Sequence, residues 1–195
     1  LDDELVLYLP FSRGNETSST TVYDRSKYGN DGMCVGVSSD YGCNWTSGPN
    51  GNALRFDGDD DFINTSDTSS LSGLSELTIT YWMKSSSDGN NYADHVSKFG
   101  TNNKEWYLGG KINYFELLIY DESAGGYIGR RDTNINIWDN QWHHIVGTWD
   151  GGTTDSTSIK LYVDGNQVDD TTVESGTFSG AEDLDEEVII GGGKA

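Results

Sequence analysis

Alternation of apolar and polar residues along almost the whole chain is the feature that most limits its fold. Large apolar side chains recur at every second position in segments such as Leu77-Thr78-Ile79-Thr80-Tyr81, and clusters of Gly, Asn, Asp and Ser interrupt these segments after a few residues. Successive side chains of a β-strand point to opposite sides, so a period of two is typical of strands with one buried face. No segment shows a convincing helical period. The sequence therefore predicts an all-β protein.

The strands that this pattern predicts follow one another from end to end. They are Glu4–Leu9, Gly32–Val37, Ala53–Phe56, Asp61–Asn64, Glu76–Lys84, His95–Phe99, Glu105–Gly109, Ile112–Tyr120, Gly126–Gly129, Gln141–Trp149, Ser158–Val163, Gln167–Val173 and Glu187–Gly191. Asp164-Gly165 lies between two of them and predicts a hairpin, because a type I′ turn needs positive φ at both central residues. Trp82 adds a large side chain to the second face of its strand, which predicts a central strand covered on both sides.

The charge of the chain excludes one class of partner. The 195 residues include 12 Lys and Arg against 32 Asp and Glu, a formal net charge of −20. Binding to a phosphate backbone depends on clustered basic residues, so nucleic acid is excluded as a direct partner. Aromatic residues make up 12% of the chain, more than a disordered polypeptide carries. The acidity fits either a salt-adapted protein or an ordinary secreted β-domain.

Length and composition favour one compact unit that does not enter a membrane. A chain of this length suits a single β-sandwich or barrel, and neither a repeat nor a linker divides residues 1–195. Its apolar stretches are too short to span a bilayer. Cys34 and Cys43 would close a short loop if they paired, and such a disulfide predicts a location outside the cytoplasm. Two unpaired thiols are the alternative.

Several short motifs follow one another in a specific order. They are VYDRSKYGNDG, GNALRFDGDDDFI, LTITYWMKS, HVSKFG, WYLGG, DNQWHHIVGTWDG, IKLYVDGNQV and VIIGGG. In this order they resemble the laminin-G-like modules of the concanavalin A-like lectin and glucanase superfamily, over nearly the whole chain. The resemblance implies a jelly-roll sandwich of two curved antiparallel sheets in one domain, an extracellular or cell-surface location, and binding sites on the concave sheet or its loop rim. Such modules normally continue after Ile-Gly-Gly-Gly with a further strand, which residues 1–195 do not contain.

Candidate sugar-binding residues lie in the middle third of the chain, where aromatic residues are frequent. Exposed aromatic rings stack against sugar rings, and amide, carboxylate or guanidinium groups beside them bond hydroxyls. The candidates are Tyr92, Trp106, Tyr114, Tyr127, Arg130 and Trp138. Further residues of the same kind in this stretch are Tyr107, Tyr120, Asn90, Asn91, Asn103 and Asp121. Packing inside the protein is the alternative for most of them.

A cation site is a second candidate. The run Asp57-Gly58-Asp59-Asp60-Asp61 places four carboxylates in one turn, and oxygen-rich clusters suit calcium. The run is not an EF-hand, because Phe62 and Thr68 stand where that loop needs Gly and Glu. The family resemblance implies a calcium site assembled from two segments. Its ligands would be Asp24, Asn30, Asp57 and Asp60. The alternative is an acidic, solvated hairpin.

The remaining functional motifs favour a scaffold rather than catalysis. His143 and His144 are adjacent on a predicted strand and point to opposite faces, so they are not expected to share a metal. Trp82 and Trp149 are expected in the core. The Glu-x-Asp-x-Glu strand of laminarinase-type hydrolases is missing, and the nearest run, 183–187, begins with Asp. The sequence therefore predicts a non-catalytic module that binds carbohydrate or a glycosylated surface, with a protein-binding or structural domain of a larger adhesin as the alternative.

Overall fold

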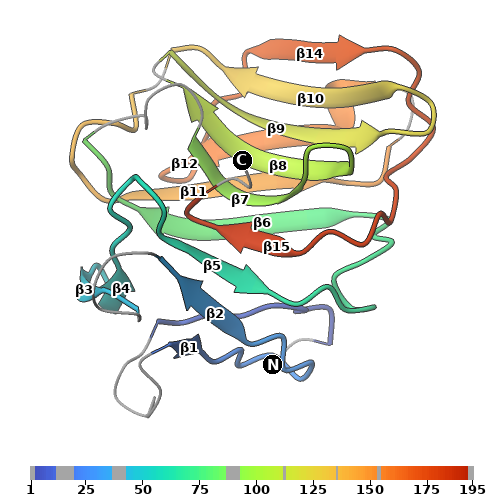
Figure 1. Cartoon of the computed structure of the whole chain (residues 1–195). Helices are drawn as coiled ribbons and strands as arrows, with labels where there is room; N and C mark the ends of the chain where they lie inside the picture. Colours follow the sequence, from blue (N-terminus) through green and yellow to red (C-terminus); the bar gives the residue numbers. More distant parts are fainter. Residues whose placement is uncertain are drawn as a thin grey trace.

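Two antiparallel sheets packed face to face form the protein (Figure 1). The computed structural model describes residues 3–11, 20–36, 43–86, 93–111, 113–134, 136–152 and 155–192. An α-helix is absent from these residues, which contain one short 3-10 turn, Ser156–Ser158. Within the described part of the chain, no helix is long and apolar enough to cross a bilayer. The architecture is the all-β sandwich that the period of two predicts.

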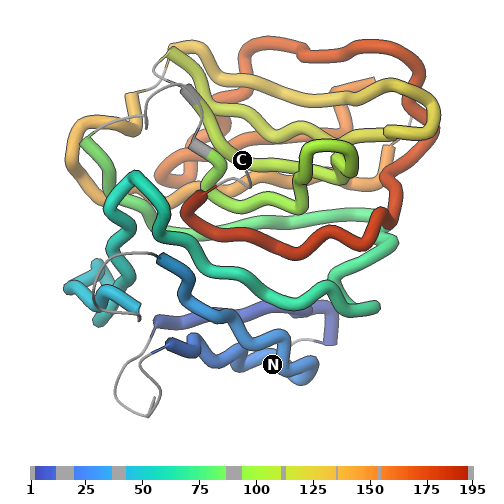
Figure 2. Tube along the Cα trace, viewed as in Figure 1, coloured from blue at the N-terminus to red at the C-terminus, as the bar shows by residue number. Residues whose placement is uncertain are grey.

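The strands of the larger sheet come from most of the chain. In spatial order they are β1 (Thr21–Val22), β2 (Gly32–Val35), β5 (Phe62–Thr65), β15 (Val188–Ile190), β7 (Ala93–Phe99), β8 (Lys104–Lys111), β9 (Tyr114–Asp121), β10 (Gly126–Asp132) and β14 (Thr171–Ser175). The last strand, β15, lies between β5 and β7, as the red segment of Figure 2 shows. The middle of this sheet is therefore complete only when β15 pairs with β5 and β7, which come from the first half of the chain.

The second sheet has four strands, and a small hairpin lies beside the sandwich. The four strands are, in spatial order, β13 (Asn166–Gln167), β12 (Ile159–Val163), β11 (His143–Trp149) and β6 (Leu77–Met83). The hairpin pairs β3 (Trp45–Gly48) with β4 (Gly51–Leu54). Asp164 and Gly165 both have positive φ, 51° and 81°, and join β12 to β13 as a two-residue turn. This confirms the hairpin predicted from Asp-Gly.

The hydrophobic core fills the space between the two sheets. Leu108 and Leu117 of the larger sheet and Ile145 and Leu161 of the smaller one are completely buried in it. Gly147 marks a close approach of the two sheets, because a Cβ atom at this position would lie 3.1 Å from Leu108 and 3.2 Å from Leu117. Side chains of one parity in each strand fill this layer. Side chains of the other parity are left on the two outer faces.

Several predictions about individual strands are wrong. The single strand expected at Gln167–Val173 is divided between β13 in the smaller sheet and β14 in the larger one. The segment expected as strand 4–9 is irregular, because Tyr8 donates its N–H to the Asp24 carboxylate and accepts the Arg25 N–H instead of pairing with a strand. The strand around Trp82 is an edge strand and not a central one. Its outer face is open, and Trp82 is 46% exposed, whereas Trp149 lies in the core as expected.

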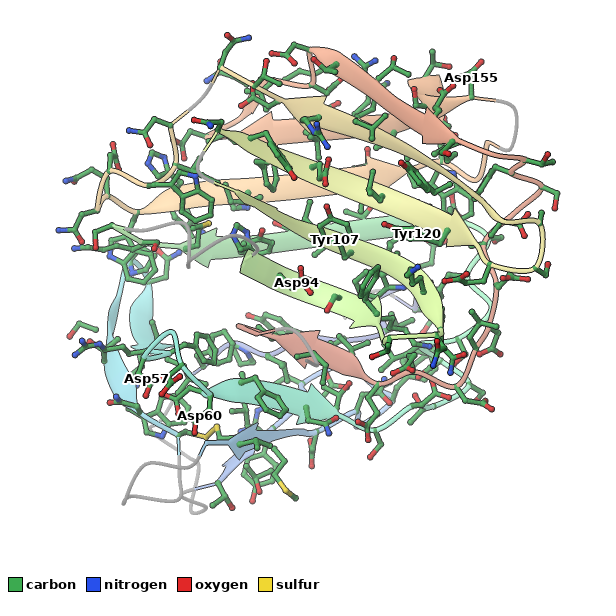
Figure 3. All side chains as sticks on the ribbon, turned by 45° about the horizontal axis from the view of Figure 1, so that its top comes forward. Asp57, Asp60, Asp94, Tyr107, Tyr120 and Asp155 are labelled. Atoms are coloured by element: carbon green, nitrogen blue, oxygen red, sulfur yellow. A yellow bond between two sulfur atoms is a disulfide. The ribbon has the colours of Figure 1, made fainter. Side chains whose placement is uncertain are left out.

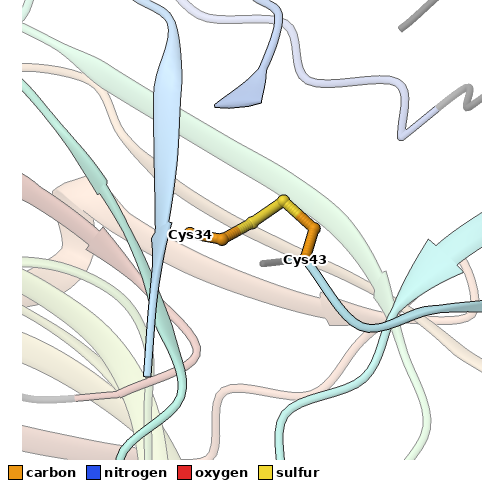
Figure 4. The surroundings of a disulfide bond; sticks show 2 residues. All are labelled: Cys34 and Cys43. Carbon is orange, nitrogen blue, oxygen red and sulfur yellow. A yellow bond between two sulfur atoms is a disulfide. The ribbon is translucent and has the colours of Figure 1, made fainter. Parts of the chain in front are cut away.

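A disulfide ties the larger sheet to the small hairpin. Cys34 in β2 bonds to Cys43, two residues before β3, with 5.3 Å between the Cα atoms (Figure 4). No free cysteine remains in the chain. The expected pairing is therefore present. In the chain-entropy account, closing a loop of this size contributes about 3 kcal/mol to stability by restricting the unfolded chain.

One lysine is buried completely and joins distant segments. The Lys98 ammonium at the end of β7 lies 3.0 Å from Asp67 and 3.1 Å from Glu105, and its side chain is 0% exposed. It also donates to the Leu71 carbonyl oxygen. Glu105 in turn accepts the Leu184 N–H, so strand β8, the loop before β6 and the segment before β15 meet at this ion cluster.

We expect replacement of Lys98 to destabilise the protein far more than replacement of an exposed lysine. Lys98→Ala leaves the buried Glu105 carboxylate without its cation, so the free energy of unfolding should fall by about 3 to 5 kcal/mol. Lys27 pairs with Asp3 at 2.8 Å at an exposed site, so Lys27→Ala should cost less than about 1 kcal/mol. Urea unfolding of both variants measures the difference. Equal losses would show that the buried cluster is not a stabilising junction.

Candidate functional site

The outer face of the nine-stranded sheet, the side turned away from the core, carries a group of polar and aromatic residues. Figure 3 shows Asp94, Tyr107 and Tyr120 on the neighbouring strands β7, β8 and β9. Asp94 lies opposite Gly109, Gly109 opposite Glu116, and Glu116 opposite Arg131. Residues directly opposite each other share a face of the sheet. These side chains therefore form a row that crosses four strands, which we call the acid row.

Glu116 and Arg131 form a tight ion pair at one end of the acid row. The Arg131 Nε atom lies 2.7 Å from the Glu116 carboxylate, which also accepts the Tyr107 hydroxyl. The guanidinium group covers the Tyr114 ring at 3.8 Å. Burial raises the pKa of Glu116, and the nearby Arg131 opposes that rise only in part. The charge of Arg131 is consequently already neutralised within the protein.

Asp94 stands at the other end of the acid row and has a different environment. Its carboxylate is half-buried, and no described residue donates a hydrogen bond to it. Burial raises the pKa of Asp94 because the charged form loses solvation without gaining a partner. Next to it, Gly109 contributes no side chain. A half-buried, unpaired carboxylate on a sheet face is a natural acceptor for a ligand hydroxyl or amine.

Aromatic rings lie beside the acid row. Tyr120 packs against Phe99 and Tyr127, with ring centroids 5.5 Å and 5.2 Å apart, and Phe99 packs against Tyr107 at 5.7 Å. Tyr120 and Tyr127 are directly opposite each other and half-buried, so part of each ring is open to solvent. Such a cluster offers apolar ring faces next to hydrogen-bonding groups, which is the composition of a carbohydrate site.

The structure separates the residues that the sequence predicted for sugar binding. Tyr114 and Tyr127 lie on the outer face. Trp106 lies in the core and is 5% exposed, and its ring is therefore not available to a sugar. Arg130 points to the opposite side from Tyr127 and bonds Asp169 and Thr172.

The two other predicted residues lie elsewhere. Trp138 is half-buried and packs against the core beside His95, at 5.4 Å between ring centroids. Tyr92, with Asn90 and Asn91, lies outside the described residues. Trp138 therefore does not join the acid row and its aromatic neighbours.

Three polar residues of the outer face were missed by sequence reasoning. They are Asp94, Glu116 and Arg131. Glu116 and Arg131 could have been found from the alternation of inward and outward side chains. Phe115, Leu117 and Ile119 define the core side of β9 and leave Glu116 on the other side. The same parity in β10 puts Arg131, and not Arg130, on the same face as Tyr127. Asp94 could not be placed in this way, since a register irregularity between Asp94 and Val96 breaks the alternation.

A second group of carboxylates lies at the turn before β5. Single oxygens of Asp57, Asp60 and Asp61 all lie within 4.8 Å of one another, and Figure 3 shows Asp57 and Asp60 side by side. Burial, opposed by a hydrogen bond from the Asp57 N–H and reinforced by the charges of Asp57 and Asp60, raises the pKa of Asp61. Three hard oxygen donors at this spacing fit a hard cation such as calcium. Two of them already accept backbone N–H groups, Asp57 from Asp59 and Asp61 from Asp57.

Asp24 and Asn30 do not join that acidic group. One Asp24 oxygen accepts the N–H groups of Tyr8 and Ser26, and the other accepts the Ser26 hydroxyl and the Asn30 N–H. Asn30 donates its amide to the Val6 carbonyl oxygen. Both residues are thereby used to hold their loop against the N-terminal segment.

The two adjacent histidines contact different residues, as their opposite orientation predicts. His143 lies between the Asp164 and Asp139 carboxylates, at 2.8 Å and 3.1 Å. His144 bonds the Thr80 hydroxyl at 2.8 Å and stacks against the exposed Trp82. The two imidazole rings therefore have no contact partner in common.

Comparison with known proteins places this sandwich among binding folds. A family model described as the concanavalin A-like lectin/glucanases superfamily, of the laminin G type, matches residues 57–194. Among curated proteins, no sequence matches the chain.

Solved structures with the same fold include binding domains of clostridial toxins. The receptor binding domain of botulinum neurotoxin mosaic serotype C/D has a TM-score of 0.67 and 15% identity over 95% of this chain and 42% of its own. The binding domain of Paraclostridial Mosquitocidal Protein 1 has a TM-score of 0.63 and 16% identity over 89% and 44%. The chain thus spans less than half the length of these proteins. At such identities the likeness shows the fold alone.

We expect the Asp94 carboxylate to cost stability at neutral pH. Its folded pKa lies above the usual 3.8, so the penalty is absent below about pH 3.8 and complete once the pH exceeds the folded pKa. Asp94→Asn should therefore raise the free energy of unfolding at pH 7, with a smaller gain near pH 4. Urea unfolding across this range measures the change.

Asp155 provides a control of opposite sign. The hydroxyl and N–H of Thr157 lower the pKa of Asp155, so its charged form stabilises the protein. Asp155→Asn should lose stability at pH 7 relative to pH 4. A loss of stability in Asp94→Asn at pH 7 would contradict the environment described for Asp94.

Proposed function

Because the chain belongs to the laminin-G-like group of the concanavalin A-like lectin/glucanases superfamily, we propose that it is a non-catalytic recognition module that binds carbohydrate or a glycosylated surface. The outer face of the nine-stranded sheet is the proposed site. The observation that carries this proposal is that the Asp94 carboxylate, to which no described residue donates a hydrogen bond, shares this face with the partly open rings of Tyr120 and Tyr127. Hydroxyls would bond the carboxylate while the apolar side of a sugar ring contacts tyrosine.

A role in binding rather than catalysis is supported by the acidic run before β15. Residues 183–187 lie outside any strand, and the Leu184 and Glu186 N–H groups both donate to Glu105. The run therefore does not present alternate carboxylates along a regular strand, as a laminarinase-type site would. Glycoside hydrolysis needs two carboxyl groups at a defined separation on either side of the bond.

An extracellular or cell-surface location is part of the proposal. The Cys34–Cys43 disulfide supports it, since disulfides persist mainly in oxidising compartments. A protein-binding or structural role within a larger adhesin is the second candidate. It is favoured by Met33 and Val35, which are 59% and 38% exposed on neighbouring outward positions of β2.

Calcium binding at Asp57, Asp60 and Asp61 also belongs to the proposal. The three carboxylates supply hard oxygen ligands, and the ion would offset the burial and the mutual repulsion that together raise the pKa of Asp61. Asp24 and Asn30, expected as ligands from the sequence, are left out because their polar atoms hold their own loop. The ion would stabilise the turn before β5, and sugar binding at the outer face would not depend on it.

Replacement of Tyr120 should abolish most sugar binding. We expect Tyr120→Ala to weaken binding by about tenfold or more, which corresponds to about 1.4 kcal/mol. The binding sugar is identified on a glycan array in calcium-containing buffer, and its affinity for both proteins is then measured by titration calorimetry. Trp82→Ala is the matched control, because Trp82 is an exposed aromatic residue on the outer face of the other sheet. No binding to any sugar, or equal losses in both variants, would refute the proposed site.

Calcium should stabilise the folded protein if the turn before β5 binds it. A ligand present at about 100 times its dissociation constant adds about 2.7 kcal/mol to the free energy of unfolding. The melting temperature should rise with calcium chloride, return with a chelator, and respond less in Asp60→Asn. Asp155→Asn removes the same charge at a distant position and should keep the full response. An identical calcium response in both variants would exclude the Asp57 to Asp61 turn.

A further inference from the structure

We propose that the outer face prefers sugars that carry a protonated amine, with the Asp94 carboxylate as the group that pairs with it. The inference rests on the carbohydrate-binding function proposed above and specifies its ligand class. It follows from the distribution of charge on this face, where the described cations are paired and one carboxylate is not.

The positive groups that the structure describes on this face, Arg131 and Lys104, are already paired with carboxylates. Arg131 is held by two contacts to Glu116, Nε at 2.7 Å and a terminal nitrogen at 2.5 Å, and covers the Tyr114 ring. Lys104, near the rings of Phe99 and Tyr120, is paired with Glu122 at 3.3 Å. A uronate or a sulfated sugar would have to compete with these carboxylates, and it would approach a chain of net charge −20.

The negative group that remains is Asp94. Its carboxylate has no donor among the described residues, and its burial has already removed part of its hydration. Glu116 lies in the same row beyond Gly109, but its charge is offset by Arg131, so Asp94 is the carboxylate of the row that is left for a ligand cation. Because the desolvation cost is present in the free protein, a cation that reaches Asp94 recovers more energy than at a hydrated carboxylate.

Charge also distinguishes an amine from a hydroxyl or an amide. Hydrogen bonds between an ammonium and a carboxylate are about twice as strong as those between neutral groups. A neutral hexose can donate hydroxyls to Asp94, and an N-acetylated amino sugar can donate its amide. A free amino sugar gains the additional ionic interaction at the same position. Among sugars of similar shape, the outer face should therefore prefer those that carry a charged amine to pair with Asp94.

The test compares sugars that differ only at the amine. Oligomers of glucosamine, oligomers of N-acetylglucosamine and oligomers of a uronic acid are titrated into the whole chain at pH 6, where the amine is charged. We expect the free amine to bind at least about tenfold more tightly than the acetylated form, with the uronate weakest. In Asp94→Asn this preference should disappear. Asp155→Asn removes a negative charge away from the face, as Figure 3 shows, and should keep the preference.

The outcomes separate the two proposals. Equal affinity for free and acetylated oligomers, or a preference that survives in Asp94→Asn, would overturn the role of Asp94 and leave sugar binding intact. Binding of none of the three sugars, together with an empty glycan array, would overturn both. Asp94→Asn is expected to be at least as stable as the parent protein at this pH, and a circular dichroism melt checks that lost binding does not come from unfolding.

Discussion

The close contact of two sheets is the constraint on which the rest of this protein depends. At Gly147 the backbone of the smaller sheet approaches Leu108 and Leu117 of the larger one so closely that a methyl group would be crowded. One apolar layer must therefore serve both sheets, and each strand can contribute only side chains of one parity to it. Every other side chain is directed to an outer face, where the acidic residues of the chain can remain hydrated.

Among the described residues, the buried charged groups have ion-pair or hydrogen-bond partners, whereas no described residue donates to the half-buried Asp94. Lys98 is surrounded by Asp67 and Glu105, and the buried Glu116 is held by Arg131. Pairing is the usual condition for a buried charge, because an unpaired one loses its solvation without compensation. Asp94 does not meet this condition. Residues whose environment costs stability are frequent at functional sites. The costly environment of Asp94 is therefore the physical reason to place the proposed binding site near this residue.

Prediction from the sequence succeeded where local chemistry decides the structure. The Asp164-Gly165 turn depends on backbone angles that few residues tolerate, and the period of two defined most strands. It failed where distant segments decide. That Trp82 lies on an edge strand depends on which strands pair with β6. The error for Trp106 has a local cause, because the alternation of inward and outward side chains along β8 was not applied to it and its ring lies in the core. The ligand role that the family resemblance implies for Asp24 stays a prediction, and both of its oxygens already accept hydrogen bonds in the loop around it.

The shared use of strands by core and site limits how this face can change. In β9, Phe115 and Leu117 fill the core while Tyr114 and Glu116 between them lie on the outer face. Inserting or deleting a single residue there would exchange the two sets, putting a carboxylate into the apolar layer and aromatic rings into solvent. Ligand preference in such a protein can consequently diversify by substitution at alternate positions, whereas changes in length are confined to the connecting loops. In related chains, substitutions at the outward positions of such a strand should therefore affect recognition and leave folding unchanged. Substitutions at its inward positions should affect folding and leave recognition unchanged.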